Sequence, residues 1–108
     1  MIRAFVDRMV TMAKLRYPLK TLGVTDLELR AAIHSGVTRA RQYGIDLTGD
    51  VERFIRLMFQ LRTFNFEEDP LFMWTGEVLR DTSLTPEAKL DWVEARAAIQ
   101  GLIGDKGE

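Results

Sequence analysis

Apolar residues recur at spacings of three and four along most of the chain, which is the pattern of helices with one buried face. The first helix that this pattern predicts spans residues 1–16. Its apolar face comprises Ile2, Phe5, Val6, Met9, Val10 and Ala13. Pro18 follows, and because proline cannot continue a helix, we expect the first helix to end just before it.

Two more helices follow in the first half. The segment Thr25-Asp26-Leu27-Glu28 has the pattern of a capping box and predicts where the second helix begins. That helix should bury Leu29, Ile33, Val37 and Ala40 and end near Gly44, since glycine suits the left-handed position after a helix. The third helix, over about residues 50–62, has an unusually wide apolar surface. This surface comprises Val51, Phe54, Ile55, Met58, Phe59 and Leu61. A helix of this kind is typical of the centre of a bundle.

Two proline signals predict the last helices. Asp69-Pro70 is typical of an N-cap followed by proline at the first helical position, so a short fourth helix should run to about Arg80. Thr85-Pro86 repeats the signal and begins the fifth helix. We predict that the buried face of the fifth helix comprises Ala88, Trp92, Ala95, Ile99 and Leu102. Gly101 and Gly104 should end it, and residues 104–108 should form a loose tail.

The fold class predicted from this pattern is all-α. The chain shows no sustained strand alternation, no internal repeat and no linker long enough to divide it. At 108 residues it has the length of one domain. We therefore predict a single helical domain over residues 1–108, formed by one compact bundle of about five helices.

Composition narrows the possibilities without pointing to a reaction. The absence of cysteine excludes disulfides, thiolate metal sites and cysteine nucleophiles. No apolar run approaches the roughly 20 residues that a membrane span needs. Charges at Arg3, Asp7, Arg8 and Lys14 interrupt the N-terminal apolar segment, which argues against a secretory signal. We therefore predict a cytoplasmic protein that does not bind a membrane.

Charge is unevenly divided between the two halves of the chain. Residues 1–62 carry 11 basic and 6 acidic side chains, whereas residues 63–108 carry 4 and 10. Two interpretations are open: the halves complement each other inside one fold, or they form a polarised binding surface. We favour the first.

No set of residues predicts catalysis or metal binding. His34 is the only histidine, and its neighbour Ser35 should point elsewhere because adjacent helical residues face different directions. The acidic triplet Glu67-Glu68-Asp69 lacks the ligand spacing of a calcium loop, and the glycines form no phosphate-binding loop. We therefore predict no enzyme activity, no cofactor, no metal and no small-molecule ligand.

Nucleic-acid binding is a weaker alternative. Arginines on the second and third helices could form a basic face: Arg39, Arg41, Arg53, Arg56 and Arg62. The third helix is too apolar to act as a recognition helix. Part of the charge should also be neutralised within the fold, because Glu52 and Arg56 stand four residues apart.

The candidate partner-binding site lies around the connection between the third and fourth helices. Its residues are Phe64, Phe66, Phe72, Met73 and Trp74, with Glu67 and Glu68 at the polar rim. Aromatic residues and Met are enriched at interfaces, but the same segment could cover the core as a lid. Phe72 and Trp74 should lie about 200° apart on a helix, so we expect at least one of them to be substantially exposed.

Several segments together resemble a family of small bacterial proteins that are often encoded beside type VI secretion spike and effector genes. The likeness covers roughly residues 17–100. The segments that carry it are Tyr17-Pro18-Leu19, Leu22-Gly23, and residues 28–45, 50–59, 64–74 and 84–93. Met73 stands where the family has a second proline, so the geometry of that turn should differ. The resemblance implies an accessory role rather than catalysis.

The sequence therefore predicts a non-enzymatic protein–protein interaction module. The expected role is an adaptor, chaperone or co-chaperone of a secreted effector, with an effector, a spike component or a toxin as partner. The alternative is an immunity protein that binds and masks a cognate toxin. A helical nucleic-acid-binding protein and a small enzyme rank below both.

Overall fold

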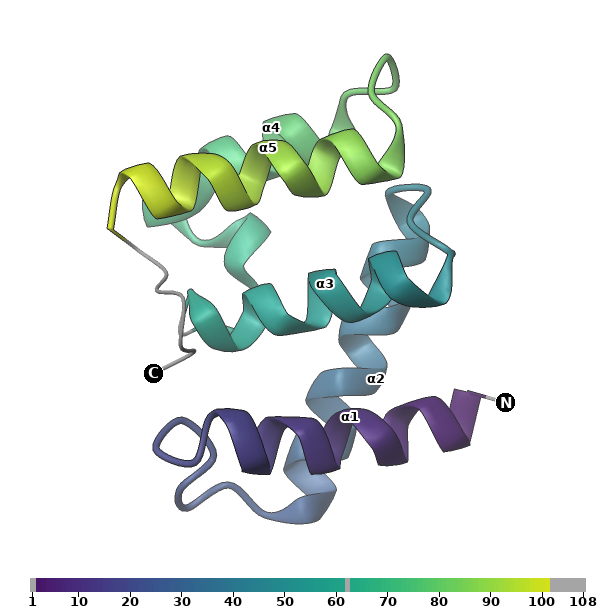
Figure 1. Cartoon of the computed structure of the whole chain (residues 1–108), viewed down its shortest axis with the longest axis vertical. Helices are drawn as coiled ribbons and strands as arrows, with labels where there is room; N and C mark the ends of the chain where they lie inside the picture. The colour runs from purple at the N-terminus through teal and green to yellow at the C-terminus, as the bar shows by residue number, and fades with distance from the viewer. Residues whose placement is uncertain (1, 62, 102–108) are drawn as a thin grey trace.

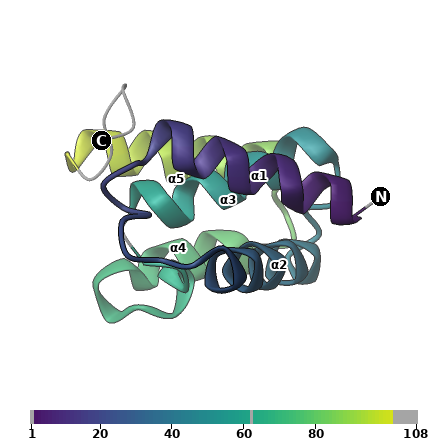
Figure 2. The same ribbon diagram turned by 90° about the horizontal axis from the view of Figure 1, so that it is seen from below.

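The computed structural model describes residues 2–61 and 63–101, which form a helical bundle. Its elements are α1 (Ile2–Arg16), α2 (Asp26–Gln42), α3 (Thr48–Gln60), η1 (Phe66–Glu68), η2 (Pro70–Phe72), α4 (Met73–Arg80) and α5 (Pro86–Ile99), where η1 and η2 are short 3₁₀ turns. Helices α1, α3 and α5 are stacked in one layer, and α2 and α4 form the second layer (Figures 1 and 2). The described residues contain no strand, so the predicted all-α bundle is confirmed.

The predicted ends of α1 and α2 are confirmed. Helix α1 stops at Arg16, two residues before Pro18. The capping box forms, because the Thr25 hydroxyl accepts from the Glu28 N–H at 3.1 Å and the Glu28 carboxylate accepts from the Thr25 N–H at 3.0 Å. Gly44 adopts the left-handed conformation with φ of +81° just after α2. Local chemistry therefore sets these boundaries.

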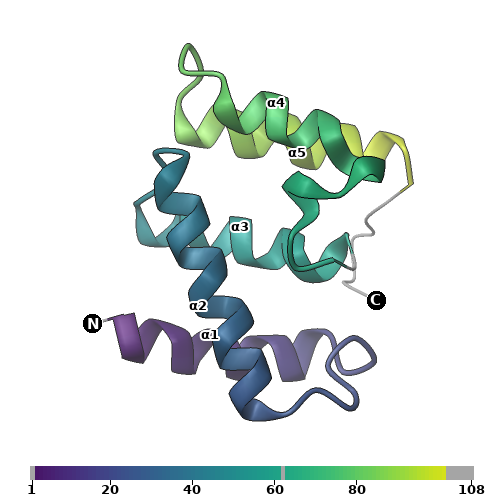
Figure 3. The same cartoon turned by 180° about the vertical axis from the view of Figure 1, so that it is seen from behind.

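Helix α3 occupies the centre of the bundle. It packs against α1, α2 and α5. Figure 3 shows α3 between α1 and the α4–α5 pair, with α2 crossing in front of α1 and of one end of α3. All six apolar residues predicted for it are buried, and Leu57 joins them. The buried faces predicted for α2 and most of α1 are also confirmed. Phe5 is only half-buried against the core, and the side chain of Ile2 lies outside the described residues.

The fourth helix begins later than the sequence predicts. The Asp69 carboxylate accepts from the Leu71 N–H at 2.9 Å, so Asp69 caps a helical start as expected. The turn that follows Pro70 is 3₁₀, however, and α-helical geometry begins only at Met73. A tight 3₁₀ turn is common at the start of an α-helix.

The predicted buried face of α5 is wrong. Ile99 is 86% exposed, Trp92 is 50% exposed, and Ala95 is exposed as well. The face that packs on the bundle comprises Leu90, Val93 and Ala97. At roughly 100° per residue the two sets lie on opposite sides of the helix. Leu102 and the predicted tail, residues 104–108, lie outside the described residues.

Close packing between α2 and α3 depends on Gly36. A Cβ atom at this position would lie 2.5 Å from Met58 Sδ and 2.6 Å from Ile55 Cδ1. Both neighbours are fully buried, so they have little room to move. The absence of a side chain at Gly36 therefore lets the two helices approach each other.

We predict that Gly36→Ala lowers the free energy of unfolding by about 1–3 kcal/mol, because an extra methyl group overpacks the α2–α3 contact. The matched control is Gly49→Ala in the first turn of α3, where an added Cβ would meet nothing within 4 Å. The control should be neutral or slightly stabilising. Urea unfolding of both variants measures the difference, and equal stabilities would contradict the close-packing account.

Candidate functional site

A buried ion pair organises the connection between α3 and α4. Glu67 in η1 is completely buried at its side chain, and its Oε2 accepts from Arg39 Nε of α2 at 2.6 Å. Arg39 also donates to the carbonyl oxygen of Phe64 and to Ser35 Oγ. Tyr43 Oη donates to the same Glu67 oxygen at 3.3 Å. Burial raises the pKa of Tyr43, and the Glu67 charge raises it further.

This arrangement places two residues of the predicted partner-binding site inside the fold rather than at its surface. Phe66 is fully buried and packs against Phe54 of α3 with ring centroids 5.2 Å apart. Glu67 was predicted to lie at a polar rim, but it is buried and paired with Arg39. The 3₁₀ turn directs both side chains inward. The Phe66 ring enters the core, and the Glu67 carboxylate enters the ion pair. Neither can contact a partner in this conformation.

The remaining residues of the aromatic segment differ in exposure. Phe64 lies edge-on to Phe59 at 5.5 Å and is half-buried. Phe72 and Trp74 are both half-buried against the core, so neither is the substantially exposed residue that helical spacing predicts. Met73 is 53% exposed, and Glu68 is exposed. The segment is therefore mainly a lid over the core, with Glu68, Leu71 and Met73 at its surface.

A second apolar surface lies on the outward side of α5. We define the α5 face as Ala88, Trp92, Ala95 and Ile99. Together with Asp91 and Arg96 these residues line a shallow, open hollow of about 630 Å³. The guanidinium group of Arg96 stacks on the Trp74 ring at 4.9 Å, so the α5 face continues through Arg96 toward α4. Helical spacing in the sequence identifies these apolar residues but predicts that they face the core.

Helix α5 is fixed to α3 by a salt bridge beside this face. Arg53 contacts both oxygens of Glu94, through Nη2 at 2.7 Å and Nε at 3.1 Å, and its Nη2 also contacts Asp91 at 2.7 Å. Hydrogen bonding to Glu94 raises the pKa of Arg53 above its ordinary value. On the other side, the buried Lys89 donates from Nζ to the Tyr43 carbonyl oxygen at 2.8 Å. These contacts hold α5 in one orientation.

Basic residues of the first half of the chain therefore pair with acidic residues of the second half. Arg39 pairs with Glu67, and Arg53 pairs with Asp91 and Glu94. Glu52 and Arg56 form the predicted pair within α3 at 2.8 Å. The contacts of Arg39 and Arg53 support the interpretation that the halves complement each other. Arg39, Arg53 and Arg56 are therefore neutralised and do not contribute to a basic face for nucleic acid. Arg62, which was predicted to belong to that face, lies outside the described residues.

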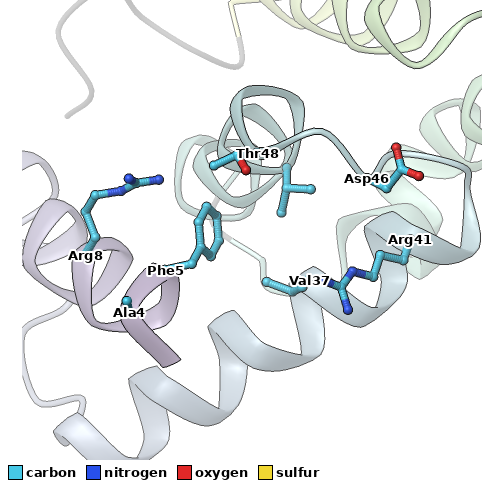
Figure 4. A pocket seen from close by; sticks show the side chains of 8 residues that line it. Ala4, Phe5, Arg8, Val37, Arg41, Asp46 and Thr48 are labelled. Atoms are coloured by element: carbon cyan, nitrogen blue, oxygen red, sulfur yellow. The ribbon is translucent and has the colours of Figure 1, made fainter. Parts of the chain in front are cut away.

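A separate pocket lies between α1, α2 and the start of α3 (Figure 4). It has a volume of about 350 Å³. Its lining residues are Ala4, Phe5, Arg8, Val37, Arg41, Asp46, Thr48 and Val51. Phe5, Val37 and Val51 form the apolar floor. Arg8 and Arg41 lie on opposite sides of Phe5 and Val37 (Figure 4).

The candidates for catalysis do not come together. His34 is exposed on α2, and the hydroxyl of its neighbour Ser35 accepts from Arg39 Nη1 at 2.8 Å. Within residues 2–61 and 63–101, no three His, Asp or Glu side chains are grouped as metal ligands would be. Over the same residues, no helix has the length and apolar character needed to cross a bilayer.

No protein-family model matches this sequence, and searches of curated proteins and of solved structures gave no match. The likeness to proteins encoded beside type VI secretion genes therefore stays a prediction from the sequence.

We predict that Phe66→Ala lowers the free energy of unfolding by about 3–5 kcal/mol, because it opens a cavity next to Phe54. Met73→Ala, seven residues later in the same aromatic segment, should change it by less than about 0.5 kcal/mol, since this side chain is largely exposed. Thermal or urea unfolding of the two variants tests the lid interpretation. Similar losses at both positions would show that the segment packs differently.

Proposed function

We propose that this chain is a non-enzymatic protein–protein interaction module that receives an amphipathic helix of a partner protein on the α5 face. The observation that carries the proposal is the exposure of Trp92 and Ile99 on a helix whose opposite side is already packed. Large exposed apolar side chains on one stripe favour an interaction surface over a solvated one.

The spacing of the α5 face suits a helical partner. Its residues follow one another at intervals of four, three and four positions, which is the seam pattern of paired helices. The small side chains of Ala88 and Ala95 alternate with the large ones of Trp92 and Ile99. A second helix could therefore place its ridges against the alanines and pack around Trp92.

The residues on and beside the α5 face are also of the types found at binding hot spots. Trp and Arg are the residue types that most often contribute large binding energies. Here Trp92 and Arg96 are one turn apart on α5, and Arg96 is stacked on Trp74. This stacking holds the arginine over a defined surface, which reduces the entropy lost when a partner binds.

The biological role that we propose is an accessory one: an adaptor, chaperone or co-chaperone of a secreted effector. The sequence resemblance suggests type VI secretion as the setting, with an effector or spike component as the partner. The same surface would serve an immunity protein that masks a toxin, so this second role is kept as an outcome of the test.

We predict that Trp92→Ala weakens binding to the cognate partner at least about tenfold, because truncating a central interface tryptophan removes a large buried contact. The chain is co-expressed with the product of each neighbouring gene, and the affinity of any complex is measured by calorimetry. The matched control is Leu71→Ala, since Leu71 is 79% exposed but lies on η2 rather than α5. Both variants should melt within about 2 °C of the parent.

Three outcomes decide the proposal. A complex that is sensitive to Trp92→Ala but not to Leu71→Ala supports it, and protection of cells from an adjacent toxin would assign the immunity role. No complex with any neighbouring product, or one indifferent to Trp92, contradicts it. If Trp92→Ala instead converts a dimer of the purified chain to a monomer, a second copy occupies the face and the proposed partner is wrong.

A further inference from the structure

The pocket between α1, α2 and α3 combines an apolar floor with two arginines whose charges are little neutralised by carboxylates. Val37 and Val51 are buried, and Phe5 is half-buried beside them. The guanidinium group of Arg8 lies 5.3 Å from the centre of the Phe5 ring. A volume of about 350 Å³ is within the range of small-molecule sites.

The two arginines are available to a ligand. Arg8 reaches Glu52 only at 3.9 Å, and Glu52 is already hydrogen-bonded to Arg56 at 2.8 Å. Arg41 forms no ion pair with any residue that the structure describes. They differ from Arg39 and Arg53, whose guanidinium groups are held by carboxylates of the second half of the chain.

The balance of charge around the pocket is positive. Arg8 and Arg41 approach from two different helices, and Thr48 adds a hydroxyl group between them along the rim. The one acidic lining residue, Asp46, lies at the Arg41 end of the pocket (Figure 4). Guanidinium groups bind carboxylates through charge-assisted hydrogen bonds. The apolar floor would contact the rest of such a ligand.

From this geometry we propose that the pocket binds a small organic carboxylate with an apolar body, its acid group held at the rim by the positive charge of Arg8 and Arg41 and its body on Phe5, Val37 and Val51. The proposal is independent of the α5 face, because the two surfaces share no residue. The sequence pattern indicated no ligand of this kind, since Arg8 is far from Arg41 and Thr48 in the chain.

The test titrates the whole chain with 4-phenylbutyrate and, in parallel, with its neutral analogue 4-phenylbutanamide. Binding is followed by amide chemical shifts in nuclear magnetic resonance spectra. We expect saturable shifts at Thr48 and Val51 with the acid, with a Kd of about 1 mM or tighter for a ligand of this size. The amide should bind at least about fivefold more weakly, because it has no charge for the arginines.

Variants separate a built site from a chance groove. Arg8→Gln and Arg41→Gln should each weaken 4-phenylbutyrate binding about fivefold or more. Asp46→Asn should strengthen it about twofold, because it removes the opposing charge. Arg16→Gln, an exposed arginine at the end of α1 outside the pocket, is the control and should leave the Kd unchanged. All four positions are exposed, so the variants should melt like the parent.

Loss of acid binding in both pocket variants, together with an unchanged control, would support the proposal. The proposal would be overturned if 4-phenylbutyrate gave no saturable shifts. It would also be overturned if the amide bound equally well, or if Arg8→Gln and Arg41→Gln bound like the parent.

Discussion

The connection between α3 and α4 depends on the buried ion pair between Arg39 and Glu67. A carboxylate placed among apolar side chains is costly unless a cation and hydrogen bonds compensate it. Arg39 compensates the Glu67 charge at Oε2, and its contact with the Phe64 carbonyl oxygen also holds the chain three residues before Glu67. Once Glu67 is held, Phe66 enters the core beside Phe54. The positions of η1, η2 and α4 follow from these contacts.

The second constraint is that α5 has apolar residues on both sides. Leu90, Val93 and Ala97 pack on the bundle, while Trp92 and Ile99 face outward. The bonds from Arg53 to Glu94 and Asp91 select which side faces α3. An interaction surface on α5 is therefore a consequence of the same contacts that hold the helix in place.

Local signals in the sequence predict most of the helix boundaries and the core of α1 to α3. The helix boundaries at Pro18, Thr25 and Gly44 depend on neighbouring residues alone. The wide apolar surface of α3 can be buried only if that helix lies at the centre of the bundle. The errors arise where the outcome depends on distant partners. The inward rotation of Glu67 requires Arg39, which is 28 residues away. Two apolar faces on α5 are equally compatible with helical spacing, and salt bridges to α3 distinguish between them.

The candidate sites were less predictable for the same reason. Residues of the pocket come from three helices, so no continuous segment contains its pattern. The α5 face could be read from its spacing, but its exposure could not, because burial depends on how the helix is oriented against α3. The aromatic segment around Phe66 has the composition of an interface, and only the fold shows that most of it covers the core.

A double-mutant cycle at Arg39 and Glu67 tests the central claim most directly. Free energies of unfolding are measured in urea for Arg39→Met, Glu67→Gln and the combined variant. We expect each single change to cost about 3–5 kcal/mol, because it leaves the other charged or polar group buried without its partner. The combined variant should cost at least about 2 kcal/mol less than the two added together. Additive losses, or single changes that cost less than about 1 kcal/mol, would show that the connection does not depend on this pair.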